Sequence, residues 1–224
     1  MMLYVQYGCG QCAPDGWISF DASPRLFLER IPGLQILMHL TVGTLFPANV
    51  LRGNIVKGLP LPDSSASAVY CSHVLEHLPR EELPLALRNT FRLLKPGGVF
   101  RLVVPDLQWR AARYLASAAN GKSGAADNFM NSCGLGKNKR PARLIDYARE
   151  CFGKSAHLWM YDFDGLKSLL EDAGFTSVRR IEFGDSGDPL FAKVEDRARF
   201  FEGNERELAI AAMRPNQNHV LQIV

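Results

Sequence analysis

The chain has 224 residues, of which 47% are hydrophobic, and a formal net charge of +3. A chain of this length can bury a full core, and its nearly neutral charge argues against a nucleic-acid-binding protein. The longest apolar stretch, residues 34–46, is shorter than the roughly 20 residues that span a bilayer. The N-terminus lacks the basic segment and long apolar run of a signal peptide. We therefore expect a cytoplasmic protein with no membrane partner.

The first 105 residues contain candidate strands, each an apolar run bounded by turn residues. These runs cover residues 3–7, 16–21, 50–54, 66–72 and 98–105. Between the last two runs, apolar residues recur at helical spacing from Leu83 to Leu94, which predicts a helix there. Lys95 and the sequence PGG that follows it are typical of a helix end.

The last 70 residues continue the alternation of helices and strands. Asp162 is a candidate N-cap, the residues from Leu166 to Ala173 place an apolar stripe on one helix face, and Gly174 suits the C′ position. Strand-like runs at 176–183 and 207–213 have no clear helix between them, which is typical of an antiparallel hairpin. The pattern predicts an α/β, Rossmann-like fold with a mostly parallel twisted sheet, flanking helices and an antiparallel C-terminal edge hairpin.

We expect one domain over residues 1–224, with an inserted lid or substrate segment at 120–155. That segment is rich in Gly, Asn, Ser and basic residues, and its hydrophobic periodicity is weak. Long irregular segments in compact domains are usually functional or disordered.

The stretch YGCGQCAPDGW, which begins at Tyr7, allows more than one interpretation. Cys9 and Cys12 form a C-x-x-C pair, but the following APDGW leaves no room for the helix N-terminus that a redox dithiol needs. A structural zinc site needs four ligands, and the other cysteines form no second close pair. Five cysteines at irregular spacing also argue against a disulfide framework and for a reducing environment.

The same stretch matches the G-x-G-x-x-A fingerprint of dinucleotide-binding proteins, so an NAD(P)-linked oxidoreductase is one alternative. That fingerprint opens a helix and has an acid about 20 residues further on, whereas Asp21 follows Gly10 by only eleven positions. The segment from Gly10 to Trp17 is too short for a complete crossover helix. The sequence therefore predicts an abbreviated first crossover, with an acid placed to bind the ribose of a cofactor.

Two further stretches, LPLPDSSASAVYCSHVLEHL and RLLKPGGVFRLVVPD, resemble the class I S-adenosylmethionine-dependent methyltransferases. The resemblance is nearest to small predicted methyltransferases of the methyltransferase type 11 family, and it covers most of the chain. It implies S-adenosyl-L-methionine as cofactor and methyl transfer to a small-molecule acceptor. It does not identify the acceptor.

The resemblance implies cofactor contacts at seven positions: Gly8, Gly10, Asp21, Asn54, Ile55, Ser72 and His73. Among them, Asp21 would bind the ribose hydroxyls and Asn54 would stand where the family often has an acid near the adenine. Gln6, Cys12 and Asn54 depart from the family pattern. These departures leave a second alternative, a non-catalytic cofactor- or partner-binding module on the same fold.

Histidines are the candidate general bases, because their unperturbed pKa lies near neutral pH. His73 and His157 are the candidate catalytic residues. Candidate substrate contacts are Lys137, Arg140, Arg143 and Tyr161. The basic members of this set could clamp an anionic substrate, because guanidinium groups pair well with carboxylates and phosphates.

His73, Glu76 and His77 have the i, i+3, i+4 spacing that places residues on one helix face. A related E-x-x-E-H arrangement binds a divalent metal in some quinone-pathway methyltransferases, but the first position here is a histidine. We expect a histidine and a capping acid at a helix start, and no metal site.

Overall fold

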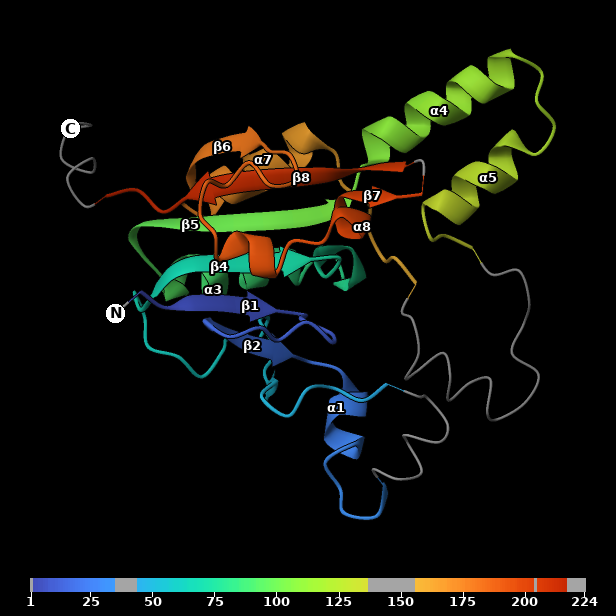
Figure 1. Cartoon of the computed structure of the whole chain (residues 1–224). Helices are drawn as coiled ribbons and strands as arrows, with labels where there is room; N and C mark the ends of the chain where they lie inside the picture. The colour runs from blue at the N-terminus through green and yellow to red at the C-terminus, as the bar shows by residue number, and fades with distance from the viewer. Residues whose placement is uncertain (1, 35–43, 137–155, 204, 217–224) are drawn as a thin grey trace.

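The computed structural model describes residues 2–34, 44–136, 156–203 and 205–216. Its centre is a mixed sheet with the strand order β3-β2-β1-β4-β5-β8-β6, and β7 pairs with β8 (Figure 1). The strands are β1 (Tyr4–Tyr7), β2 (Trp17–Asp21), β3 (Leu51–Arg52), β4 (Ala66–Ser72), β5 (Leu94–Pro105), β6 (Thr176–Arg180), β7 (Phe201–Glu202) and β8 (Glu205–Met213). Strands β1 to β5 pair in parallel, whereas β8 is antiparallel to its neighbours β5 and β6. The predicted Rossmann-like fold with an antiparallel edge is therefore confirmed.

The described helices are short or of moderate length, and none is long and apolar enough to cross a membrane. The α-helices are α1 (Pro24–Leu28), α3 (Leu83–Leu93), α4 (Leu107–Ala119), α5 (Ala125–Ser132), α7 (Phe163–Asp172) and α8 (Arg197–Phe200). Two 3₁₀ turns, η1 (Leu75–His77) and η2 (Phe191–Lys193), complete the set. As predicted, Asp162 caps α7 by accepting a hydrogen bond from Gly165 N, and Gly174 follows the helix with a φ of 98°.

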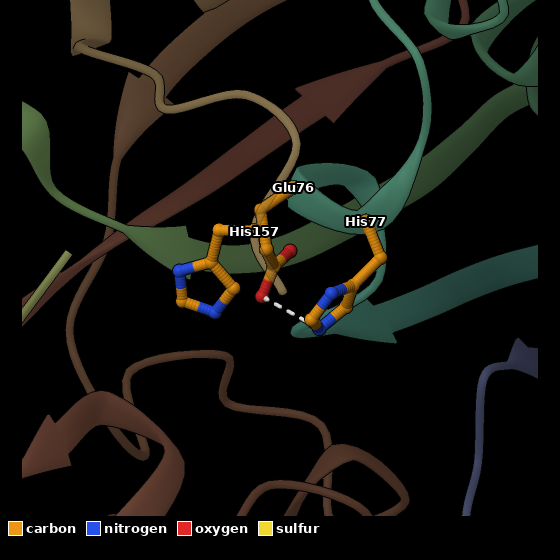
Figure 2. Close-up of side chains that lie close together, drawn as sticks. All are labelled: Glu76, His77 and His157. Atoms are coloured by element: carbon orange, nitrogen blue, oxygen red, sulfur yellow. Dashed lines mark ion pairs between the residues drawn. The ribbon is translucent and has the colours of Figure 1, made fainter. Parts of the chain in front are cut away.

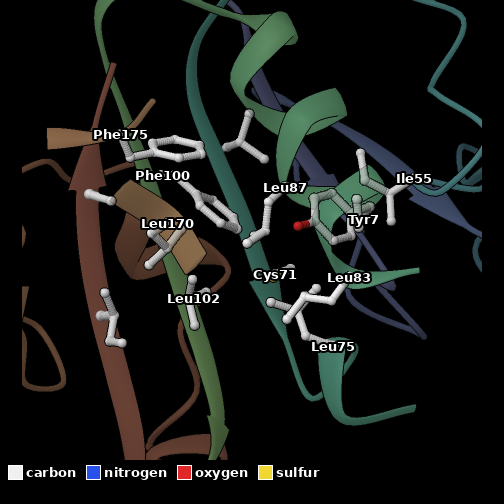
Figure 3. Packing of buried hydrophobic residues seen from close by; sticks show 14 of the residues in the cluster. Tyr7, Ile55, Cys71, Leu75, Leu83, Leu87, Phe100, Leu102, Leu170 and Phe175 are labelled. Atoms are coloured by element: carbon white, nitrogen blue, oxygen red, sulfur yellow. The ribbon is translucent and has the colours of Figure 1, made fainter. Parts of the chain in front are cut away.

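Both faces of the sheet are buried, so its strands carry apolar side chains on each side. Val5, Val69 and Leu102 belong to the largest core cluster, on the face that α3 and α7 cover. Figure 3 shows Leu102 in this cluster together with Leu87 of α3 and Leu170 of α7. The strand residues next to Val5 and Val69, such as Tyr4 and Tyr70, point to the opposite face. This alternation explains why the central strands read as nearly continuous apolar runs.

The second face is covered by a long connection rather than by a helix of the first crossover. Residues 8–16, between β1 and β2, form turns and contain no helix, as the sequence predicted. The segment 181–200, which includes η2 and α8, crosses this face instead (Figure 1). Phe191 packs edge-on against Trp17, with 5.4 Å between the ring centroids, and Trp17 Nε1 donates a hydrogen bond to Leu190 O.

Several boundaries differ from the sequence-based expectation. Strand β5 begins at Leu94, before the PGG sequence, and its pairing with β4 shifts register between Ala66 and Ala68. Strand β6 ends at Arg180 because the chain leaves the sheet there to cover the second face. Helix α4, which the sequence analysis did not anticipate, begins where Asp106 caps Trp109 N.

The predicted lid or substrate segment is only partly described. Its residues 120–136 include α5, which packs against α4 in an antiparallel pair that projects beyond the carboxyl ends of the parallel strands (Figure 1). Residues 137–155 lie outside the described residues, and so do the substrate candidates Lys137, Arg140 and Arg143.

Candidate active site

A pocket of about 280 Å³ lies at the carboxyl ends of β1 and β4. These two strands are neighbours in the sheet although β2 and β3 follow β1 in sequence, so the pocket occupies the topological switch point where α/β folds bind ligands. Its lining comes from the end of β1 with the loop that follows it, the end of β4, and the segment from the end of η2 into α8. The residues are Gln6, Tyr7, Gly8, Cys9, Gln11, Cys12, Tyr70, Ser72, Lys193, Val194, Glu195, Asp196 and Arg199.

The two glycines of the β1–β2 loop have left-handed backbone conformations, with φ of 65° at Gly8 and 55° at Gly10. Side chains other than glycine rarely adopt this region without strain. A Cβ at Gly8 would overlap the side chain of Val74, so this glycine is required by packing. A Cβ at Gly10 would meet no atom within 4 Å, so Gly10 leaves open space beside the loop.

Asp21, at the end of β2, holds this loop in place. Its Oδ2 accepts a hydrogen bond of 2.9 Å from Gly10 N, and its Oδ1 accepts one of 2.8 Å from Ser23 N. The carboxylate is buried, with 8% of the residue exposed. Each oxygen has a second lone pair, so the group can still accept hydrogen bonds from a ligand.

Gln6 stands where the family that this sequence resembles commonly has an acid. Its amide makes hydrogen bonds to the loop and to β2. Nε2 donates to Cys12 O at 2.7 Å and to Ser19 Oγ at 2.8 Å. A carboxylate could not make these two donations, because it only accepts when ionised. Gln6 therefore fixes the far end of the loop whose near end is fixed by Asp21.

The two cysteine thiols of the loop lack the lowered pKa that redox chemistry requires. Burial raises the pKa of the Cys9 thiol to about 12 and also raises that of Cys12. Redox-active C-x-x-C pairs need the opposite, a thiol whose pKa is lowered by a helix N-terminus or a nearby cation. Both cysteines are free thiols.

A wall of the pocket formed by the end of β4 and the connection from η2 to α8 carries both hydrogen-bond donors and cations. The buried hydroxyls of Tyr70 and Ser72 line the pocket, and apart from each other they have no hydrogen-bond partner among the described residues. Lys193 and Arg199 come from the connection that covers the second face, and Lys193 Nζ also donates a hydrogen bond of 3.0 Å to Asp15 O in the β1–β2 loop. Buried polar atoms normally have partners, so hydroxyls with so few partners at a pocket indicate a place for a polar ligand.

That wall is anchored by a buried ion pair. Arg101, in β5, lies 2.6 Å from Glu195 Oε1 through Nη2 and 2.9 Å from Asp185 Oδ1 through Nη1. Its guanidinium also lies over the ring of Phe191, 5.2 Å from the centroid. Arg101 and Glu195 are almost fully buried, so they fix the segment around η2 to the sheet.

His73 follows Ser72 directly, but both of its ring nitrogens are engaged. Nε2 lies 3.0 Å from Arg199 O, to which it must donate, and Nδ1 lies 3.3 Å from Glu76 Oε1. Burial disfavours a charged ring, but the hydrogen bond and negative charge of Glu76 outweigh it and raise the pKa of His73. Its backbone φ of 54° is unusual for a residue other than glycine. The geometry makes His73 a link between β4 and the Arg199 wall.

The remaining predicted site residues lie away from this pocket. Asn54 is exposed and its Oδ1 accepts from Val56 N, while the side chain of Ile55 is buried in the main core. Tyr161 is buried beside Leu75, and burial raises its pKa to about 12. His157 donates through Nδ1 to Cys133 O at 2.7 Å, and its ring lies 5.0 Å from that of His77. Burial lowers the pKa of His157.

Residues 12–180 match a family that is described as a methyltransferase domain. The chain belongs to this family. S-adenosylmethionine is the cofactor of this methyltransferase. The pocket fits such a polar ligand, because buried hydroxyls line it and the loop beside it leaves open space at Gly10.

Individual relatives agree with the family but share little sequence with this methyltransferase. A segment of 49 residues is 46% identical to the probable methyltransferase ltbC of Aspergillus luteorubrus, and the match covers 21% of this chain and only 17% of that protein. The structure of a SAM-dependent methyltransferase from Methanosarcina mazei has a TM-score of 0.51 at 19% identity, over 96% of this chain and 92% of that one. At that identity it shows the fold alone.

Sequence reasoning missed the pocket wall formed by Lys193, Glu195 and Arg199. These residues lie in a polar stretch with no strong periodicity, so only the three-dimensional path of the chain brings them to the switch point. The buried Glu195 gave a weak signal, because an acid between Phe191 and Phe200 needs a buried partner if the aromatic residues enter the core.

Proposed function

We propose that this methyltransferase transfers the methyl group of S-adenosylmethionine to a small anionic acceptor. The observation that carries the proposal is the pocket at the β1–β4 switch point, whose wall presents Lys193 and Arg199 beside the buried hydroxyls of Tyr70 and Ser72. Cations at a pocket attract anionic ligands and orient them. When bound, the cofactor supplies an electrophilic methyl group on a positively charged sulfur.

We assign cofactor binding to the loop that carries Gly8 and Gly10, and recognition of the ribose to Asp21. Gly10 lets the backbone approach the ligand closely, because no side chain fills the space beside it. Asp21 fixes the loop and retains lone pairs for ribose hydroxyls. Methyl transfer needs alignment of the acceptor atom with the methyl group and the sulfur, and rigid positioning of this kind can supply much of the rate enhancement.

An anionic acceptor also suits the proton chemistry of the site. No histidine is among the described residues that line the pocket, and Glu195 is paired with Arg101. Asp196 accepts from Ala198 N and so caps α8. An acceptor that is already deprotonated needs no general base, whereas a neutral hydroxyl or amine would need one.

Binding and turnover experiments test this proposal. Calorimetry should detect binding of S-adenosylhomocysteine but not of NADH, and a labelled methyl donor should mark carboxylate- or phenolate-containing metabolites in preference to neutral ones. Arg199→Ala should raise KM for the acceptor, while Arg197→Ala is the matched control. Arg197 belongs to the same short helix, but its guanidinium lies over the ring of Phe201 and not in the pocket. Selective labelling of neutral acceptors would contradict the anionic assignment.

A non-catalytic cofactor-binding module is the second candidate, favoured by the internal role of Gln6 where an acid is common. It predicts that S-adenosylhomocysteine binds but no acceptor pool becomes labelled. The NAD(P)-linked alternative is not retained, because the chain belongs to a methyltransferase family.

A further inference from the structure

A second group of polar side chains surrounds Glu76, outside the lining of the pocket. Glu76 lies in η1, and its side chain is fully buried. Its Oε1 pairs with His73 Nδ1 at 3.3 Å and lies 3.9 Å from His77 Nε2, whereas Oε2 has no hydrogen-bond partner among the described residues. A buried carboxylate with so few partners is costly unless a positive charge compensates it.

His77 and His157 lie on either side of this carboxylate (Figure 2). His77 Nδ1 is 3.2 Å from Ala156 O, and His157 Nδ1 is 2.7 Å from Cys133 O. A carbonyl oxygen can only accept, so each Nδ1 carries the proton. In each neutral ring, Nε2 therefore keeps a free lone pair. Metal-binding histidines commonly have this arrangement, with one ring nitrogen donating to a carbonyl and the other coordinating.

Backbone hydrogen bonds hold Glu76 and His157 next to each other. Glu76 O accepts hydrogen bonds from Leu158 N at 2.7 Å and from Trp159 N at 3.1 Å, which fixes the segment carrying His157 to η1. On the other side of the ring, a Cβ at Gly134 would lie 2.7 Å from His157 Nδ1. The close packing at Gly134 and the bond to Cys133 O limit rotation of the imidazole. The arrangement is thus built before any ion binds.

We propose that Glu76, His77 and His157 form a binding site for a divalent transition-metal ion of the zinc type. One ligand atom from each residue lies within 4.8 Å of the others. Ligand atoms around tetrahedral zinc are about 3.3 Å apart, so a modest inward movement of the side chains completes the site. Two imidazole nitrogens and one carboxylate oxygen suit zinc, and three protein ligands leave a coordination position open for water or another oxygen ligand.

The competing explanation is an ion pair without metal. A protonated His73 would compensate the Glu76 carboxylate by itself, since Nδ1 is the nearest nitrogen to Oε1. This explanation assigns no role to His157, whose ring lies beside the same carboxylate (Figure 2). Experiment can distinguish the ion pair from the metal site, because only the metal site requires His157.

Metal titration of the full-length protein tests the proposal. After chelator treatment and dialysis, Zn²⁺ is titrated by calorimetry and Co²⁺ by visible absorption, both in a Cys12→Ser background that removes the thiol that is exposed among the described residues. We expect one equivalent to bind and cobalt to show the intense absorption bands of a four-coordinate site without thiolate charge transfer. The absence of saturable binding would overturn the proposal in favour of the ion pair.

The variants are chosen to keep the fold. His157→Asn and His77→Asn retain a donor for the carbonyl that Nδ1 contacts but lack Nε2, and Glu76→Gln keeps the shape of the carboxylate. Each should weaken metal binding at least about tenfold, because losing a ligand should cost no less than losing a group that only orients a ligand. His73→Gln is the matched control and should bind metal with little change. Full affinity in a folded His157→Asn protein would show that the ion binds elsewhere and would overturn the assignment.

Discussion

Gly10 N donates a hydrogen bond of 2.9 Å to Asp21 Oδ2, which ties the loop after β1 to the end of β2. In a fold with a complete first crossover, a helix would hold the glycine turn. Here no helix lies between β1 and β2, so the carboxylate performs that task. Asp21 thus has two functions in our proposal, because it fixes the loop and binds the ribose.

Asp21→Ala should weaken binding of S-adenosylhomocysteine about ten- to a hundredfold. Hydrogen bonds to a charged group contribute roughly 1.5–3 kcal/mol each, and the variant also releases the loop. Calorimetry on the folded variant measures the effect. Asp63→Ala is the control, since Asp63 precedes β4 at the opposite end of the sheet and its side chain is 62% exposed. Equal affinities in the two variants would refute the role of Asp21.

Gly10→Val should abolish cofactor binding while the sheet still folds. The new side chain meets no protein atom near its Cβ, but it occupies space beside the loop and strains a backbone with a φ of 55°. Melting curves with and without S-adenosylhomocysteine give both readouts. Gly121→Val is the matched control, because Gly121 has a φ of 65° and equally open surroundings away from the pocket. A ligand-induced rise in Tm for Gly10→Val equal to that of the control would disprove the assignment.

Bound cofactor should protect Cys12 from alkylation. Cys12 is exposed and lines the pocket, whereas Cys71 and Cys133 are buried. Its raised pKa means that little thiolate is present at neutral pH, so the reaction should be slow and should accelerate as the pH rises. Peptide mapping after iodoacetamide treatment measures the rate at Cys12 with and without S-adenosylhomocysteine. Identical rates would place the ligand away from this loop.

The sequence revealed those parts of the fold that depend on local patterns. Strand β4 and helix α7 were predicted closely, because burial on both sheet faces produces apolar runs and because Asp162 and Gly174 mark the ends of α7. The approach of His157 to Glu76 could not be predicted in the same way. It depends on two backbone hydrogen bonds to Glu76 O across a long stretch of sequence, which no periodicity reports.

A charged residue in an apolar strand is normally expected at the surface, but Arg101 in β5 is only 2% exposed. It anchors the wall that carries Lys193 and Arg199 through its ion pair with Glu195. Removing one partner of a buried ion pair leaves the other charge uncompensated, at a cost of about 3–5 kcal/mol. Arg101→Met should lower the free energy of unfolding by about that amount and should also raise KM for the acceptor.

The pH dependence of this loss of stability shows whether Arg101 acts through its ion pair with Glu195 or through packing alone. Burial raises the pKa of Glu195 above its ordinary value of 4.5, even though the charge and hydrogen bond of Arg101 oppose the shift. Without Arg101 the folded protein should favour protonated Glu195 more strongly. A group with a raised folded-state pKa stabilises the protein below its unfolded pKa, and that contribution is lost as the pH rises through the folded pKa. Urea unfolding should therefore show a smaller difference between Arg101→Met and wild type at pH 5 than at pH 8.

Arg206→Ala, which breaks an exposed ion pair with Glu182, is the control and should differ from wild type by less than about 1 kcal/mol at both pH values. A loss in Arg101→Met that is large but independent of pH would assign the role of Arg101 to its packing against Phe191 instead.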